Sequence, residues 1–208
     1  MHANFEKLPE EKKRKITDAC IKEFSLGGYM NASTNNIVKE AGISKGALFV
    51  YFKNKKDLYL YILDYAIEYY INYMQKRMKN NNPDFFQRIL DWAELKIDIS
   101  TEKPAVYNFF ASAFFNVPEI LKEDIEIRYK KLYETGYNLS VEGIDWTKLR
   151  EDIDKQKALE LIMLSLNGIL EKKIKSYKAS NDNGYSHRCQ SFQELKEYVD
   201  ILKKVFYK

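Results

Sequence analysis

Apolar residues recur along most of the chain at the three- and four-residue spacing of an amphipathic helix, without the sustained alternation that is typical of a strand. The first apolar stripe, from Ile16 to Phe24, lies in a helix that we expect to begin at Pro9 and to end at Gly27–Gly28. The pattern therefore predicts an all-α protein. Further helices are predicted over residues 33–41, 45–51, 54–79, 84–99, 104–116, 119–136, 150–177 and 191–207.

Two polar stretches interrupt this pattern. Asn80–Pro83 is the first clear break, and Ser180–Gln190 is the longest predicted loop. Between the short amino-terminal helices and the first break lies one long helix, which Asn54 is expected to cap with Asp57 as its capping-box partner. This helix is predicted to connect an amino-terminal domain to the rest of the chain.

Net charge separates these two parts of the chain. The protein has 208 residues, with 34 Lys and Arg against 30 Asp and Glu, and a formal net charge of +4. Residues 1–62 hold 11 basic and 7 acidic residues, whereas residues 63–208 hold 23 of each. A basic domain joined to a neutral one indicates that the amino-terminal part binds a polyanion. We therefore predict two domains, residues 1–62 and residues 63–208.

The short helices before residue 53 have the order of a helix-turn-helix motif. Gly42 allows the positive φ that a tight turn between crossed helices needs. Leu48 and Phe52 are expected to face a small core, and Ser33 is expected to cap the second helix. On these residues alone, the alternative is a generic three-helix core with a solvated lysine face.

Residues 33–58 closely resemble the DNA-binding segment of TetR-type transcriptional regulators. At motif level the resemblance covers residues 8–65, and beyond them only the length and the all-helical layout agree. The resemblance implies that Thr34 contacts a phosphate, that Lys45–Ala47 starts the recognition helix, and that Lys55 binds a phosphate. It also implies a second domain that binds an effector and forms a dimer.

Two positions depart from the usual pattern of that family. Phe49 stands where a tyrosine is usual, so a hydroxyl contact to phosphate is missing. Val50 is apolar where polar base readers are frequent, so we expect it to contact a thymine methyl group instead. The predicted DNA-binding residues are Ser33, Thr34, Asn35, Lys45, Gly46, Ala47, Phe49, Val50, Tyr51, Lys53, Lys55 and Lys56.

Residues 104–118 carry no charge and place a broad apolar face beside a thin polar stripe. A mostly apolar lining with a few polar groups is typical of a small-molecule pocket, but aromatic stripes are more often buried core. The residues alone favour core, whereas the resemblance implies a pocket somewhere in this domain. The candidate residues for a small hydrophobic or aromatic effector are Tyr73, Phe86, Trp92, Tyr107, Asn108, Phe110, Ala111, Ser112 and Phe114.

Two later helices carry apolar faces that need covering. The predicted helix 150–177 is apolar nearly all round in its middle, and the predicted helix 191–207 has one continuous stripe. Two such helices from each of two chains would form a four-helix dimer interface, unless both are interior to a monomer. The predicted dimer residues are Leu159, Ile162, Leu166, Ile169, Leu195, Val199 and Leu202.

Few residues suggest catalysis or metal binding. His2 is near the terminus and His187 lies in the predicted loop, while Cys20 and Cys189 show no metal-ligand spacing. The sequence holds no glycine-rich phosphate loop and no nucleophile elbow. Its longest mainly apolar stretch is about half of what a bilayer requires. We therefore expect no enzyme activity, metal or cofactor, no membrane partner, and a cytoplasmic location.

Together these patterns predict a sequence-specific DNA-binding regulator. By resemblance, we expect a homodimeric repressor that binds a pseudo-palindromic operator in double-stranded DNA and leaves it when a small hydrophobic or aromatic effector binds the second domain. The alternative is a constitutive or architectural DNA-binding protein whose second domain only dimerises.

Overall fold

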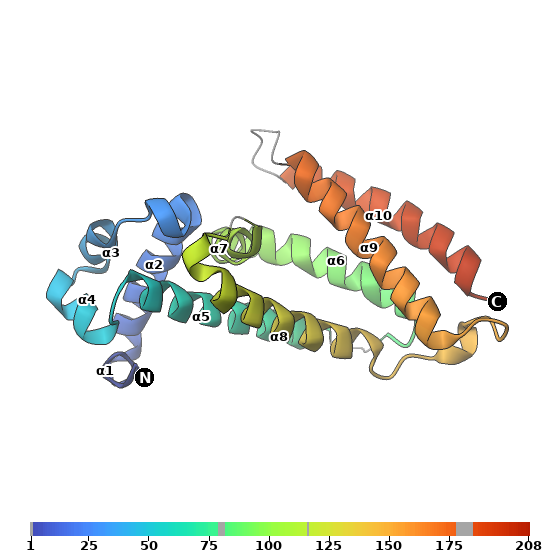
Figure 1. The fold of residues 1–208 in the computed structure, drawn as a ribbon, viewed down its shortest axis with the longest axis horizontal. Coiled ribbons are helices and arrows are strands. Elements are labelled where there is room, and N and C mark those ends of the chain that lie inside the picture. Colours follow the sequence, from blue (N-terminus) through green and yellow to red (C-terminus); the bar gives the residue numbers. More distant parts are fainter. Residues whose placement is uncertain (1, 79–81, 116, 178–184) are drawn as a thin grey trace. The chain divides into compact units, whose positions relative to one another are not determined.

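The computed structural model describes residues 2–78, 82–115, 117–177 and 185–208, with side chains left undescribed over residues 170–189. Figure 1 shows that these residues fold into helices and connecting turns, which confirms the all-α prediction. The α-helices are α1 (Ala3–Glu6), α2 (Glu10–Asn31), α3 (Thr34–Ala41), α4 (Lys45–Tyr51), α5 (Lys55–Arg77), α6 (Phe85–Glu102), α7 (Pro104–Phe115), α8 (Lys122–Val141), α9 (Lys155–Tyr177) and α10 (Tyr185–Phe206). Two 3-10 helices, η1 (Glu119–Leu121) and η2 (Trp146–Lys148), flank α8.

The chain packs as two compact units. The first unit comprises Met1–Arg77 and Ile99–Tyr137, and the second comprises Met78–Asp98 and Asn138–Lys208. Helices α6 and α8 run from one unit into the other, so the packing does not follow the division predicted at residue 62. The division at residue 62 remains a prediction of which part binds DNA and which part binds the effector and forms the dimer.

The first unit joins the amino-terminal helices to α7 through one buried core. Helix α7 packs against both α2 and α5. Its fully buried Phe109 lies with its ring centroid 5.8 Å from that of Phe24 on α2 and 5.4 Å from that of Tyr59 on α5. Burial of a phenylalanine against two aromatic rings contributes several kcal/mol, so α7 is an integral part of this unit.

Several helix boundaries differ from the prediction. Helix α1 was not predicted, because its four residues are held by the burial of Phe5 rather than by a capping bond. Helix α2 is interrupted at Gly28, whose non-helical angles (φ 59°, ψ −165°) agree with the predicted end at Gly27–Gly28, and helical residues then follow to Asn31. Helix α9 begins five residues later than expected, where Asp154 Oδ1 accepts the N–H of Lys157 (2.8 Å). Helix α10 starts at Tyr185, inside the predicted loop Ser180–Gln190, of which residues 180–184 lie outside the described residues.

A buried arginine ties the start of α6 to the end of α8 in the second unit. The Arg88 guanidinium donates to the carbonyl oxygen of Asn82, at 3.0 Å from Nε and 2.7 Å from Nη2. Its Nη1 donates to the carbonyl oxygens of Leu139, Ser140 and Glu142, at 3.1, 3.3 and 2.6 Å. All three guanidinium nitrogens are therefore satisfied by main-chain oxygens, which offsets the cost of burying the charge.

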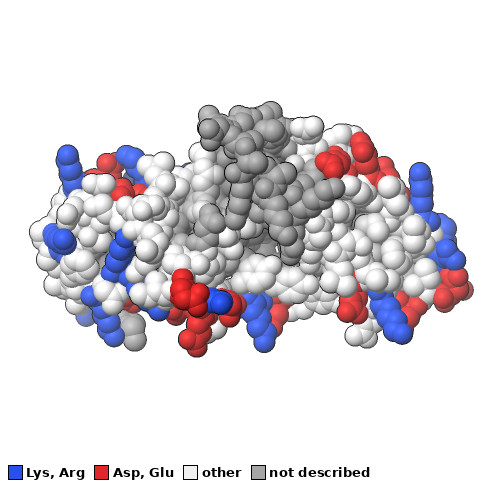
Figure 2. Space-filling model, turned by 45° about the horizontal axis from the view of Figure 1, so that its top comes forward, with Lys and Arg blue, Asp and Glu red and all other residues white. Residues whose placement is uncertain are grey.

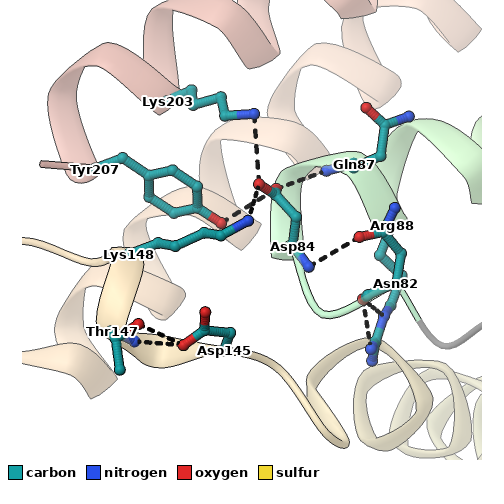
Figure 3. Close-up of polar contacts among 9 residues, drawn as sticks. All are labelled: Asn82, Asp84, Gln87, Arg88, Asp145, Thr147, Lys148, Lys203 and Tyr207. Carbon is teal, nitrogen blue, oxygen red and sulfur yellow. Dashed lines mark hydrogen bonds and ion pairs between the residues drawn. The ribbon is translucent and has the colours of Figure 1, made fainter.

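An adjacent carboxylate connects α6 to the carboxyl-terminal part of the chain (Figure 3). Asp84 Oδ2 lies 3.0 Å from Lys148 Nζ and 3.5 Å from Lys203 Nζ, and Oδ1 accepts the Tyr207 hydroxyl (3.3 Å) and the Gln87 N–H (3.1 Å). Burial would raise the pKa of Asp84, but these donors outweigh it and hold that pKa below its usual value. Asp84 thus joins three segments that are far apart in the sequence.

Candidate nucleic-acid interface

The turn between α3 and α4 has the geometry that the sequence predicts. Gly42 adopts the left-handed conformation (φ 66°, ψ 35°), and its N–H donates to the carbonyl oxygen of Lys39 (3.3 Å). The N–H of Ile43 donates to the carbonyl oxygen of Val38 (3.0 Å), which completes the cap of α3. A residue with a Cβ would be strained at this φ, so the glycine is required by the turn itself.

Helix α4 presents one face to the core and another to solvent. Leu48 is fully buried and Phe52, which follows the helix, is almost fully buried, as predicted. Val50 is 63% exposed and Phe49 is 39% exposed. Tyr51 is partly buried, with its ring centroid 6.0 Å from that of Phe5. The exposed apolar face is therefore centred on Val50.

The start of α4 is capped by a residue to which the sequence analysis gave no role. Ser44 Oγ accepts the N–H of Ala47 (3.1 Å), so Ser44 is the N-cap. Lys45 and Gly46 are exposed in the first turn, and Ala47 is partly buried. A serine directly before the first helical residue was the available signal.

The start of α3 differs from the prediction. Ser33 occupies the N-cap position, but its side chain makes no capping hydrogen bond, so the predicted capping role of its hydroxyl is wrong. Instead, Glu23 Oε1 accepts the N–H of Ser33 (2.7 Å) and Nδ2 of Asn36 (3.2 Å). Thr34 is partly buried and Asn35 is exposed at this end of the helix. The carboxylate of Glu23 thus occupies part of the helix terminus that we expected a phosphate to approach.

The cap at the start of α5 is confirmed. Asn54 Oδ1 accepts the N–H of Asp57 (2.9 Å), and Asp57 Oδ2 accepts the N–H of Lys53 (2.9 Å). The side chain of His2 also contacts Asp57, with 3.1 Å between Nε2 and Oδ1. These contacts fix the segment that carries Lys53, which is exposed.

Two adjacent lysines at the start of α5 have different surroundings. Lys55 Nζ donates to the carbonyl oxygen of Met30 (3.2 Å) and lies 5.1 Å from the centroid of the Tyr29 ring. Burial lowers the pKa of Lys55, against an opposing effect of the Glu23 carboxylate. Lys56 Nζ lies 2.7 Å from Asp124 Oδ2 and donates to the carbonyl oxygen of Ile120 (2.9 Å). Lys56 is thus engaged inside the first unit, which argues against its predicted contact with DNA.

Exposed basic side chains lie around α3 and α4. Figure 2 shows several of them on this part of the surface, with acidic side chains nearby. Lys39, Lys45 and Lys53 are exposed there. Such a distribution suits contacts to phosphates on both sides of a helix that enters the major groove.

The predicted effector residues are divided between the two units. Phe110 is stacked on Tyr70 (centroids 4.3 Å apart), and Ser112 Oγ donates to the carbonyl oxygen of Phe109 (3.0 Å), which agrees with the core interpretation of α7. The other α7 candidates, also in the first unit, are Tyr107, Ala111 and Phe114, which are partly buried, and Asn108, which is exposed. Tyr73, also in the first unit, is buried with its ring centroid 3.9 Å from Arg77 Cζ. Phe86 and Trp92 belong to the second unit, where Phe86 is fully buried.

The residues predicted for dimerisation mostly face the interior of their own unit. Leu159, Ile162, Leu166 and Val199 are buried in the second core, so they are not available to a partner chain. Ile169, Leu195 and Leu202 are partly buried. The exposed apolar residues of α9 and α10 are instead Leu161, Leu164, Ile201 and Val205. Exposed apolar side chains are therefore present on both helices, at positions other than the predicted ones.

Among residues 2–78, 82–115, 117–177 and 185–208, no group of three or more His, Cys, Asp or Glu side chains is placed to hold a metal ion. Within the same ranges, each helix is too short or too polar to cross a bilayer.

The amino-terminal segment of the chain matches a known protein family. Residues 16–62 match the family model of bacterial regulatory proteins of the tetR family. This match contains the described turn, α3 and α4.

Similar proteins extend over most of the chain. The fatty acid metabolism regulator protein of Bacillus subtilis is 23% identical over 186 residues, which cover 86% of this chain and 89% of that protein. A helix-turn-helix transcriptional regulator of Staphylococcus aureus is 28% identical over 155 residues, covering 69% and 76%.

Solved structures share the fold. A TetR family regulator from Chloroflexus aurantiacus aligns with a TM-score of 0.60 at 22% identity, over 99% of this chain and 98% of that one. The fatty acid degradation regulator of Bacillus halodurans aligns with a TM-score of 0.63 at 17% identity, over 88% and 96%. The segment match and the helix-turn-helix geometry identify residues 16–62 as a DNA-binding segment of the tetR type, and over most of its length the chain is similar to transcriptional regulators and shares their all-helical fold.

Proposed function

We propose that the protein is a cytoplasmic homodimeric repressor that leaves its operator when a small apolar or aromatic effector binds. The observation that carries this proposal is the apolar surface on α9 and α10. Leu161 and Leu164 are 56% and 61% exposed, and Ile201 and Val205 are 57% and 48% exposed. Side chains of this size at helical spacing on two adjoining helices form a face that a second copy would cover.

In a dimer, the exposed faces of two α4 helices would bind DNA together. Two copies related by a two-fold axis would place two α4 helices in successive major grooves of a pseudo-palindromic operator. In each copy, Val50 would meet base edges, while Lys45, Lys53 and Lys55 would contact phosphates. The hydrogen bond from Lys55 to the Met30 carbonyl oxygen would be exchanged for one to phosphate.

Helix α8 offers a route by which the effector would act on DNA binding. At its end, Arg88 holds the carbonyl oxygens of Leu139, Ser140 and Glu142. Near its start, Asp124 contacts Lys56, and Arg128 forms a two-pronged pair with Asp64 on α5 (2.7 Å for each bond). A shift of α8 would therefore move the start of α5, which is capped directly after α4. Coupling of about 1–3 kcal/mol would weaken operator binding by roughly 5–150-fold.

The names of two relatives support an apolar effector. A regulator of fatty acid metabolism and a regulator of fatty acid degradation are among the proteins similar to this chain. We therefore place lipid-like molecules first among the effectors to be screened.

The oligomeric state and the DNA sequence test the first part of the proposal. The double variant Leu164→Lys/Ile201→Lys should sediment as a monomer and should bind operator at least 10-fold more weakly, because two α4 helices no longer bind together. Leu26→Lys changes a leucine in the first unit that is even more exposed, and this variant should remain a dimer. Selection from random DNA should enrich an inverted repeat with the wild type. A wild-type monomer, or enrichment of a single half-site, would contradict the proposal.

A constitutive DNA-binding protein whose second domain only dimerises is the alternative. A thermal-shift screen of lipophilic compounds, followed by a measurement of operator release, distinguishes an effector-controlled repressor from a constitutive DNA-binding protein. A compound that raises the Tm and releases the operator supports effector control. A dimer that binds an inverted repeat, without any stabilising compound in the screen, favours the alternative.

A further inference from the structure

Helix α6 carries two hydrogen-bond donors that the rest of the described chain leaves without partners. Trp92 Nε1 is buried from solvent and has no hydrogen-bond acceptor. Lys96, one turn later on the same side of the helix, is partly buried and has no ion pair or hydrogen bond within the described residues. Residues four apart on a helix have Cβ atoms about 5–6 Å apart, so the two donors are close enough to share one ligand.

The surroundings of Lys96 disfavour its charge. Burial lowers the pKa of Lys96, and no carboxylate among the described side chains opposes that effect. Other cations of the second unit are well compensated, since Arg88 donates to four main-chain oxygens and Lys148 pairs with Asp84. A desolvated ammonium with no anion beside it is costly for the free protein, and a bound anion would remove that cost.

The same side of α6 becomes apolar toward its start. Ile89, one turn before Trp92, packs against the second core, which also contains the neighbouring Phe85 and Phe86. The spacing Ile89, Trp92, Lys96 therefore forms a line along α6 that runs from apolar packing, through an N–H donor, to a cation.

We propose that Trp92 and Lys96 bind the carboxylate of an effector whose remaining part is apolar. One carboxylate oxygen would accept the Trp92 N–H and the other would pair with the Lys96 ammonium. A neutral apolar compound would leave both donors unsatisfied, and a cation would be repelled. This inference rests on the proposed effector-controlled function, and it specifies the chemical class of the effector.

Decanoate is a suitable probe, with 1-decanol and decyltrimethylammonium as matched compounds of the same chain length. Trp146→Phe leaves Trp92 as the only tryptophan of the full-length protein, so its fluorescence reports binding directly. We expect decanoate to change this fluorescence and to raise the Tm. Its Kd should be at least about 10-fold lower than that of 1-decanol, and decyltrimethylammonium should not bind.

Variants at the two donors test the assignment by calorimetric titration. Lys96→Met keeps the length of the side chain and should weaken decanoate binding about 10-fold or more, with 1-decanol binding unchanged within about twofold. Trp92→Phe should weaken decanoate binding by a smaller factor, since it removes a neutral donor. Lys157→Met on α9 replaces an exposed lysine of the same unit and should bind decanoate like the wild type.

The free protein provides a second readout. Lys96→Met should raise the Tm of the ligand-free protein, because a partly buried charge without a partner among the described residues is replaced by an apolar side chain. A lower Tm, unchanged decanoate binding in Lys96→Met, or tighter binding of 1-decanol than of decanoate to the wild type would each overturn the inference. Operator binding of the same variants is measured in parallel. If it is intact and another class of compound releases the operator, the proposed function stands without the carboxylate site.

Discussion

Lys55 and Lys56 are neighbours in the sequence, but their ammonium groups contact different parts of the first unit. The Lys55 ammonium lies against the end of α2, where it donates to the Met30 carbonyl oxygen, a partner that a phosphate could replace. Lys56 is paired with Asp124 near the start of α8. The sequence predicts a phosphate contact for both, because it shows the positive charge of a lysine and not which acidic group lies next to it.

Substitution of these two lysines should have different effects on DNA binding. Lys55→Ala should weaken binding to all DNA sequences and should reduce the slope of log K against log salt by about one unit, as expected for the loss of one phosphate contact. Lys56→Ala is the matched control and should leave that slope unchanged. Fluorescence anisotropy of labelled operator over a range of salt concentrations measures both. Equal slopes for Lys55→Ala and the wild type would exclude the phosphate contact.

A second prediction at this scale concerns the turn. Gly42→Ala should lower the free energy of unfolding by about 1–2 kcal/mol, because φ at this position is +66°. Gly46→Ala is the control, since its Cβ would meet only Ser44 Oγ at 3.9 Å and alanine favours a helix. Urea unfolding of the two variants should show a loss for Gly42→Ala alone. An equal loss at Gly46 would mean that the volume of the methyl group matters, and not the backbone conformation.

At the scale of elements, apolar periodicity predicts that most of the helices exist, but it does not show which face of each helix is buried. Helix α9 is apolar nearly all round, so its sequence does not tell which side covers its own unit and which side is exposed. Burial of Leu159 and Ile162, against exposure of Leu161 and Leu164, is decided by packing with distant residues. Helix α1 shows the same limit, since four residues are too few for a period and Phe5 is buried by tertiary contacts.

Helix α7 is the element whose packing gives the sharpest prediction. Phe109→Ala should cost about 3–5 kcal/mol of stability, because it opens a cavity between the rings of Phe24 and Tyr59. Phe115→Ala, at a residue 45% exposed on the same helix, should cost less than about 1 kcal/mol. Thermal and urea unfolding measure both. A small effect at Phe109 would show that α7 is not part of the first core.

At the scale of the whole molecule, long-range polar contacts are the least predictable part of the structure. Asp84 meets Lys148 and Tyr207, which lie 64 and 123 residues away in the sequence. Many lysines could pair with a given aspartate, so the sequence does not select these partners. For the same reason Lys96 was missed as a candidate site residue, since its lack of a partner is visible only after folding. The DNA-binding motif, in contrast, is local, and its turn and caps follow from neighbouring residues.

The Asp84 contacts predict a dependence of stability on acid. The pKa of Asp84 is held below its usual value of 3.8, so the ionised form stabilises the fold at neutral pH. This contribution is present above the ordinary pKa and is lost as the pH falls below about 4 through the lowered pKa. Urea unfolding should show a shallower loss of stability between pH 5 and 3, taken as roughly the range of carboxylate titration, for Asp84→Asn than for the wild type. Asp98→Asn, at an exposed position of α6, should keep the wild-type profile.

Arg88 holds the end of α8 through main-chain oxygens alone. Every amino acid supplies such an oxygen, so this attachment does not depend on the identities of residues 139, 140 and 142. Mutational drift in that segment is therefore compatible with the attachment, whereas Arg88 itself is poorly replaceable, because lysine cannot reach the same oxygens with a planar fork. In a set of homologous sequences, the arginine should stay fixed while the residues it binds vary freely.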